Sequence, residues 1–198
     1  MKTATSKSHS FAEVIESSLQ GFTAQSWQWD TFPEFGSLVT IATKKRTLFG
    51  VVHAISTGSM EQGRYPFTYQ KTEEELLAEQ PQIFEFLKTS FSCIILGFSE
   101  HEVMLYHRAP EPPKIHAFVS LATPLEYKRF FACHNYLHVL ASSQQTESLD
   151  ELMLALLRNA HQQKLLDQAK LESFIEIYSL LIGNDYRRLK LFIQRIPI

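Results

Sequence analysis

The hydrophobic pattern of this chain changes its period at Pro124, and this change limits the fold more than any other feature. Before Pro124, short runs rich in Val, Ile, Thr and Phe are separated by turn residues; after it, large apolar residues recur at helical spacing. Closely spaced short strands favour antiparallel pairing, because parallel neighbours need long crossover connections. We therefore predict an α+β fold, in which a small antiparallel β-barrel with a helical insertion is followed by a C-terminal helical segment.

The same change divides the chain into regions. We expect residues 1–9 to form a flexible tail, residues 10–122 the β-barrel domain and residues 124–198 the helical segment. A chain of 198 residues is long enough to bury a substantial core in this arrangement.

Within the barrel region, β-rich runs predict seven strands. One hairpin is the clearest, because two runs rich in Val, Ile, Thr and Phe flank a turn that contains Lys44 and Lys45. In another run, a period of two places Trp27 and Trp29 on one face. The expected strands are residues 11–17, 22–29, 37–43, 46–56, 91–98, 102–106 and 115–121.

The helical positions are marked by capping residues. Thr72 and Glu75 form the sequence pattern of a capping box and predict a short helix in the insertion, after a loop over residues 57–70 and before a helical turn over residues 82–89. In the last third, the apolar spacing predicts helices over residues 125–142, from residue 149 to a stop at Gly183-Asn184, and over residues 186–196.

Charge and cysteine content limit the environment and the partners. The net charge of −2 is too small to attract a polyanion through the overall field. The two cysteines, Cys93 and Cys133, lie in apolar stretches, the N-terminus lacks the apolar segment of a secretory signal, and no apolar run is long enough to span a bilayer. We expect a cytoplasmic protein with no membrane partner.

Local patches keep open a nucleic-acid-binding alternative. Small barrels often present aromatic side chains for base stacking beside basic loops. Trp27 and Trp29, together with the turn residues Lys44, Lys45 and Arg46, are the candidate nucleic-acid-binding residues.

A metal-dependent enzyme is the third alternative, and it depends on two histidines. His134 and His138 stand four residues apart in an expected helix, so that both imidazoles could face one metal ion. The residue that follows the first histidine is Asn135, however, where a zinc-protease helix has the glutamate that acts as general base.

Motifs for other catalytic classes are missing from the sequence. Residues Gly58 to Tyr65 have the glycine spacing of a phosphate-binding loop, but Arg64 and Tyr65 replace its lysine and its hydroxyl residue. The sequence contains neither a Gly-x-Ser-x-Gly elbow nor a Cys-x-x-Cys pair. We expect no catalytic residues, no cofactor and a binding protein rather than an enzyme.

The helical segment carries apolar residues on more than one helical face. Phe192 and Ile193, adjacent in the last expected helix, are the candidate protein-interface residues. They predict self-association or binding to a protein partner. An intrachain bundle, in which these helices cover one another, explains the same pattern equally well.

The barrel region resembles a known family in two apolar segments that flank the cationic turn. Residues Phe35-Gly36-Ser37-Leu38-Val39-Thr40-Ile41 and Phe49-Gly50-Val51-Val52 resemble the HAS barrel, with weaker similarity over residues 79–84 and 110–116. This small β-barrel lies at the N-terminus of HerA-type DNA-translocating ATPases and of the α and β subunits of rotary ATP synthases.

The resemblance covers roughly residues 10–122 and implies an assembly role. In that family the barrel packs into a collar above the ATPase ring or holds a partner nuclease. Here helices stand where the family continues into an ATPase core, so the resemblance implies an adaptor that binds an ATPase or nuclease of DNA processing, without motor activity.

Overall fold

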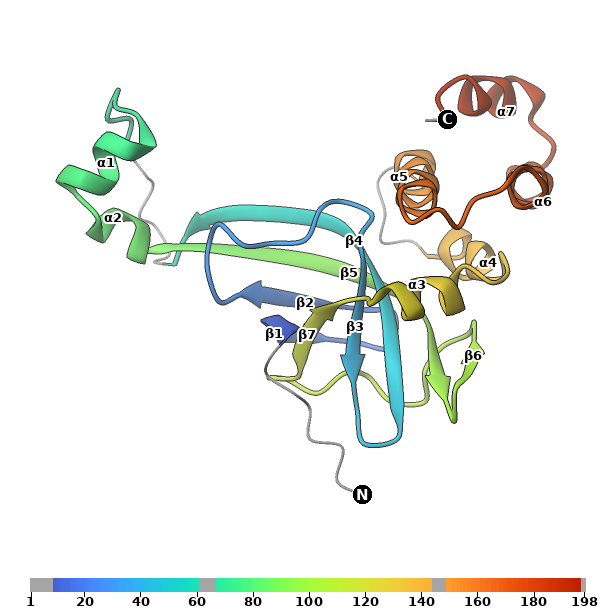
Figure 1. Ribbon diagram of the computed structural model, residues 1–198, viewed down its shortest axis with the longest axis horizontal. Helices are drawn as coiled ribbons and strands as arrows, with labels where there is room; N and C mark the ends of the chain where they lie inside the picture. Colours follow the sequence, from blue (N-terminus) through green and yellow to red (C-terminus); the bar gives the residue numbers. More distant parts are fainter. Residues whose placement is uncertain (1–8, 61–66, 144–148, 197–198) are drawn as a thin grey trace.

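Six strands of the chain close into an antiparallel β-barrel (Figure 1). The computed structural model describes residues 9–60, 67–143 and 149–196, so the expected tail falls almost entirely outside the described residues. The strand order is β2-β1-β7-β3-β4-β5, and pairing of β5 with β2 completes the ring, while the short β6 pairs only with the end of β5. The strands are β1 (Ser10–Ser17), β2 (Gly21–Ser26), β3 (Leu38–Ala42), β4 (Arg46–Ser59), β5 (Leu87–Glu100), β6 (Val103–Leu105) and β7 (Phe118–Leu121).

Small, branched and aromatic side chains fill the barrel interior, as expected for a barrel too narrow to hold a channel. Strand alternation sends one set of residues inward, and these are almost fully buried. They include Ala12, Val14, Phe22, Ala24, Val39, Ile41, Leu48, Val52, Phe91, Cys93, Ile95, Phe98 and Val119.

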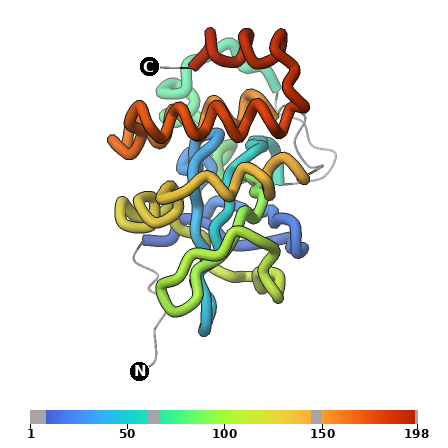
Figure 2. The backbone as a smooth tube through the Cα atoms, turned by 90° about the vertical axis from the view of Figure 1, so that its right-hand side faces the viewer, coloured from blue at the N-terminus to red at the C-terminus, as the bar shows by residue number. Residues whose placement is uncertain are grey.

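A layer of five helices covers the outer face of β3, β4 and β5 (Figure 2). The helices are α3 (Pro124–Phe130), α4 (Tyr136–Ala141), α5 (Leu149–Gln162), α6 (Gln168–Leu181) and α7 (Tyr186–Ile193). The outward-facing residues Leu38, Phe49, Val51, Ile94 and Leu96 belong to the same apolar cluster as these helices. The fold therefore has two cores, one inside the barrel and one between the barrel wall and the helices, and the predicted α+β class is confirmed.

The expected helix over residues 125–142 is broken, and that prediction is wrong in its middle. Residues 131–135 form a turn between α3 and α4. Phe130, Phe131 and Tyr136 are all buried, with ring centroids 5.0 to 5.5 Å apart. A straight helix cannot present these three positions on one face, because neighbouring residues are rotated by about 100°.

The β2–β3 loop joins the barrel to α5. Gly36 has a φ of +79°, and a Cβ atom there would collide with the Cβ of Ala155. Asn159 Nδ2 donates a hydrogen bond of 2.6 Å to the Gly36 carbonyl, and Arg158 pairs with Glu34 at 3.5 Å. Close approach, a hydrogen bond and an ion pair fix the same contact between the two layers.

The helical insertion lies at the end of a long hairpin and projects from the barrel (Figure 1). It contains α1 (Glu73–Glu79) and α2 (Gln82–Glu85), and we call residues 67–86 the arm. The hairpin extends beyond the expected strands, because β4 continues to Ser59 and β5 begins at Leu87. Cross-strand hydroxyl pairs support this extension, including Thr57 Oγ1 with Thr89 Oγ1 at 2.7 Å.

Candidate protein-interaction surface

Neither helix of the arm, α1 or α2, contains a buried residue. Its apolar side chains therefore remain on the surface, with Phe67 78% exposed and Leu77 48% exposed. Five glutamates and a single lysine give the arm a strongly acidic character. Exposed apolar side chains on a projecting helix pair are typical of a contact element rather than of a core, and the charged residues around them suit a polar rim.

Local contacts nevertheless support the arm. Thr72 and Glu75 form the predicted capping box at the start of α1, and Lys71 forms an ion pair with Glu79. Phe84 of α2 stacks on Trp29 of the β2–β3 loop, with ring centroids 5.4 Å apart. The arm is thus anchored at its base, and its outer part presents a preformed surface.

Helices α6 and α7 form the end of the molecule opposite to the arm (Figure 1). The two predicted interface residues, both in α7, differ in their exposure. Phe192 is only 2% exposed, and its ring stacks on that of Tyr178 at 4.1 Å, so the intrachain bundle accounts for its apolar character. Ile193 is 42% exposed. Of the two residues, Ile193 alone is placed where a partner could reach it.

The outer face of α7 combines apolar and basic side chains. Tyr186, Leu191 and Ile193 are between 42% and 78% exposed, and Arg187 and Lys190 lie on the same side of the helix. The helix begins at Asp185, whose carboxylate accepts hydrogen bonds from the amides of Arg187 and Arg188.

A shared carboxylate ties α7 to the rest of the helical layer. Asp150 of α5 accepts two hydrogen bonds from the Arg188 guanidinium, at 2.6 and 3.0 Å, and one from the Tyr178 hydroxyl at 2.9 Å. Burial acts to raise the pKa of Asp150, but the hydrogen bonds from Arg188 and Tyr178 outweigh it and the pKa is lowered. Burial and the bond to Asp150 raise the pKa of Tyr178 to about 12.

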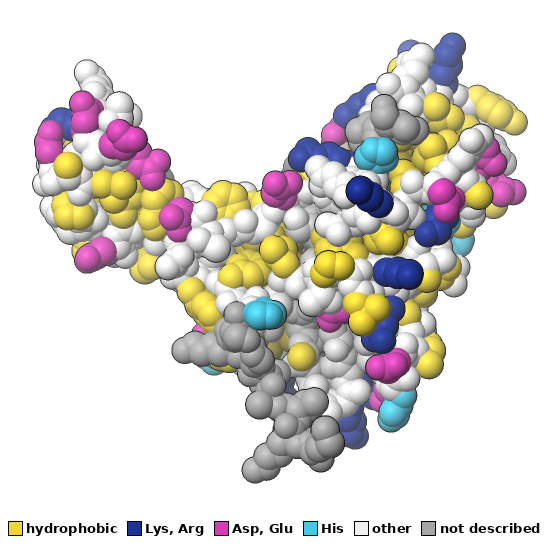
Figure 3. Space-filling model, in the orientation of Figure 1, with side chains coloured by type: hydrophobic (Ala, Val, Ile, Leu, Met, Phe, Trp, Pro, Cys, Tyr) yellow, Lys and Arg dark blue, Asp and Glu magenta, His cyan; other side chains and the backbone are white. Residues whose placement is uncertain are grey.

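The arm and the helical layer rise on either side of a broad hollow (Figure 3). The β2–β3 loop runs between them along the barrel and carries Phe32 and Phe35, which are 45% and 40% exposed. The same side of the molecule thus presents the arm, an apolar middle and the outer end of the helices. We take this side as the candidate protein-interaction surface.

The predicted nucleic-acid-binding residues are only partly brought together. Lys44 and Lys45 line a groove of about 520 Å³ with Lys114 and Phe118, which we call the cationic groove. Arg46 points its guanidinium over the Phe98 ring, 5.6 Å from the centroid, and pairs with Glu100 at 3.3 Å. Arg46 is therefore engaged within the chain, whereas Lys44 and Lys45 are exposed.

The two tryptophans do not share a face, because β2 ends at Ser26. Trp27 lies near the cationic groove, where its ring meets that of Phe118 edge-on at 5.6 Å and its Nε1 donates to Glu13. Trp29 instead anchors the arm. The expected strand over residues 22–29 is too long by three residues, and the stacking platform it implied is not formed.

The two histidines of the metal hypothesis also separate. His134 precedes α4 in the turn, is 8% exposed and lies edge-on to Phe174, whereas His138 is exposed in α4. Burial lowers the pKa of His134. Among the described residues, no group of three His, Cys, Asp or Glu side chains is arranged to hold a metal ion.

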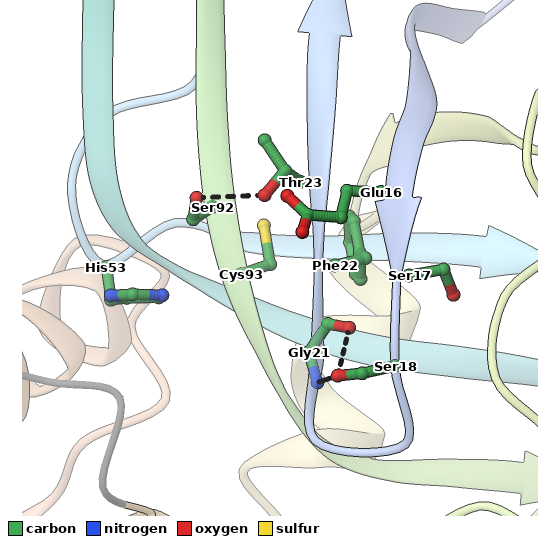
Figure 4. A pocket seen from close by; sticks show the side chains of 9 residues that line it. All are labelled: Glu16, Ser17, Ser18, Gly21, Phe22, Thr23, His53, Ser92 and Cys93. Carbon is green, nitrogen blue, oxygen red and sulfur yellow. Dashed lines mark hydrogen bonds between the residues drawn. The ribbon is translucent and has the colours of Figure 1, made fainter.

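A polar hollow of about 340 Å³ lies against the barrel wall and is lined by residues of β1, β2, β4 and β5 (Figure 4). Glu16, Thr23 and Ser92 succeed one another across the paired strands, with Thr23 Oγ1 and Ser92 Oγ 3.2 Å apart. Cys93 lies beneath, and burial raises its thiol pKa well above the ordinary value, which disfavours the nucleophilic thiolate. Figure 4 shows His53 apart from the carboxylate of Glu16, so the hollow lacks an evident acid–base pair within the described residues.

The phosphate-loop spacing at residues 58–65 gains no support. Gly58 is part of β4, and residues 61–66 lie outside the described residues. None of the helices in the described ranges has the length and the apolar composition needed to cross a bilayer.

The arm surface was missed by reasoning from sequence alone. The capping box predicted the first helix of the arm. It did not predict that both helices are exposed, because this exposure follows from the length of the hairpin that carries them. The run Glu73-Glu74-Glu75 was the available signal, because three adjacent acidic residues are seldom buried.

No family model matches the sequence, and no curated protein matches it. The closed six-stranded barrel is compatible with the HAS-barrel resemblance at the level of architecture.

Proposed function

We propose that this chain is a non-catalytic assembly or adaptor protein, built on a HAS-like β-barrel, that binds a protein partner through the arm side of the molecule. The observation that carries the proposal is the arm itself, a helix pair that is anchored at its base, contains no buried residue and has exposed apolar side chains. A surface of this kind gains stability when another chain covers it. By resemblance, the partner is an ATPase or nuclease of DNA processing.

Affinity capture with matched variants tests this proposal. We expect the wild-type chain, tagged and expressed in its native cell, to retain one protein partner at constant stoichiometry, and Leu77→Asp in the arm to lose it. Leu125→Asp is the control, because Leu125 is 58% exposed on α3, away from the arm. Equal recovery with both variants would contradict the arm as the binding element.

The cationic groove favours a second candidate function, binding of single-stranded nucleic acid. It gathers Lys44, Lys45 and Lys114 beside Phe118, from segments about seventy residues apart in the chain. Fluorescence anisotropy with an oligo(dT) probe tests it: K44E/K45E should abolish binding, and K128E/K164E, with the same change in charge, should not. If this function holds, the affinity should fall steeply with salt.

A further inference from the structure

We propose that the arm of one copy of this chain binds the outer face of α7 of a second copy, and that the contact is made twice, in a two-fold symmetric dimer. This inference rests on the proposed function of the arm as a contact element. It names a second copy of the chain, in place of the ATPase or nuclease that the resemblance suggests, as the occupant of that surface.

Charge complementarity between the two helices points to this pairing. Helix α1 contains four glutamates and no basic residue, whereas α7 contains Arg187, Arg188 and Lys190 and no acidic residue. Arg188 is bound to Asp150, but Arg187 and Lys190 have no carboxylate within salt-bridge distance in the described part of the chain. Opposite charge on the two surfaces steers encounter and fixes which faces meet.

Apolar side chains accompany the charges on both surfaces. The arm exposes Phe67 and Leu77, and α7 exposes Tyr186, Leu191 and Ile193. The helices have similar lengths, with seven residues in α1 and eight in α7. An apolar centre flanked by complementary charge is the usual composition of a specific interface.

The shape of the molecule determines the symmetry of the contact. The arm and α7 lie at opposite ends of the longest axis, so they cannot meet within one chain (Figure 1). Both ends rise on the same side of the barrel, flanking the hollow (Figure 3). A second copy turned by 180° over this side would place its α7 on the first arm and its arm on the first α7.

A closed two-fold pair has two consequences. It satisfies both surfaces of each copy and so stops at the dimer, whereas a head-to-tail contact continues into rings or filaments. The second contact is intramolecular once the first has formed, which raises the overall affinity above that of either contact alone.

Sedimentation velocity and light scattering on the full chain test this inference. Weak protein interfaces have micromolar dissociation constants. At a protein concentration of about 100 µM the wild type should therefore be a dimer and no larger. E73K/E74K and R187E/K190E should each be mostly monomeric at this concentration, because reversal of the charges in both contacts should raise the dissociation constant about a thousandfold. An equimolar mixture of the two variants should recover the dimer, because each reversed arm then faces a reversed α7.

The mixture also separates the interface from the fold, since a misfolded variant cannot restore a dimer. K128E/K164E makes the same change in net charge as R187E/K190E and should remain dimeric. A monomeric wild type, a dimer that survives either reversal, or a mixture that stays monomeric would overturn the inference. If those results coincide with loss of a captured partner in Leu77→Asp, the arm still binds protein and only the identity of the occupant is wrong.

Discussion

At the scale of single residues, glycines set how closely neighbouring segments approach. Gly36 brings the β2–β3 loop against Ala155 of α5, in a left-handed conformation that other residues rarely adopt. Gly50 lies in β4 opposite a β-bulge in β5, where the pairing passes from Gly97 to Ile95 and skips Leu96. A Cβ atom at Gly50 would lie 3.0 Å from Cε1 of Phe22 and 3.3 Å from Cβ of Cys93. The barrel core thus closes around the missing side chain.

Gly50→Val should therefore destabilise the protein by more than the roughly 1 kcal/mol that intrinsic glycine effects reach, because overpacking a core costs about 1–3 kcal/mol. Gly58→Val is the matched control, since Gly58 lies in the same strand and a Cβ atom there would have no neighbour within 4 Å. Urea denaturation of both variants provides the measurement. Equal midpoints would mean that the close approach at Gly50 relaxes at no cost.

Phe192 and Ile193 should respond in opposite ways to truncation, although they are adjacent. Phe192→Ala removes a buried ring from the helical core and should cost about 3–5 kcal/mol. Ile193→Ala changes a side chain that is 42% exposed and should leave the unfolding midpoint nearly unchanged. Thermal melts followed by circular dichroism distinguish them, and similar losses for both would contradict the placement of α7.

At the scale of elements, the helical layer depends on a polar hub and the arm on an aromatic anchor. Asp150 joins α5 to α6 through Tyr178 and to α7 through Arg188. Trp29 joins the β2–β3 loop to α2 through Phe84. Each hub links segments that are distant in the sequence, so each can be removed by one substitution.

Asp150 makes the stability of the layer depend on pH in a predictable direction. Its pKa is lowered in the folded state, so its contribution is present above the unfolded value of about 3.9 and is lost as the pH falls through the folded pKa. Asp150→Asn should lower the melting temperature at pH 7, and the difference from wild type should narrow below about pH 4. A difference that stays constant with pH would show that the carboxylate charge plays no part.

Trp29→Ala should free the arm without unfolding the barrel, because the stack on Phe84 is its aromatic anchor at the base. Hydrogen exchange followed by mass spectrometry should show faster exchange in residues 67–86 and unchanged exchange in β1 and β7. Trp27→Ala is the control, since Trp27 contacts Phe118 at the other tryptophan site. Faster exchange in the arm of both variants would argue against a specific anchor.

At the scale of the whole molecule, the sequence predicts the layers better than the surfaces. Short β-rich runs and the cationic turn were sufficient for the barrel. The capping pattern at Thr72 and the apolar spacing over residues 186–196 correctly located the starts of α1 and α7. The turn at residues 131–135 was missed because it depends on three aromatic rings packing together in space. Apolar spacing along the sequence likewise could not predict that Phe192 is buried and Ile193 is exposed, because this difference depends on how α6 and α7 pack together.

The central claim is that the arm side is where this protein contacts another chain. Cross-linking mass spectrometry in the native cell, with an amine-reactive reagent, tests it most directly. Lys71 and Lys88 mark the arm and its base, and Lys44 and Lys45 mark the cationic groove at a separate site. We predict intermolecular links to protein from Lys71 and Lys88. Links that arise from Lys44 and Lys45 alone would contradict the claim.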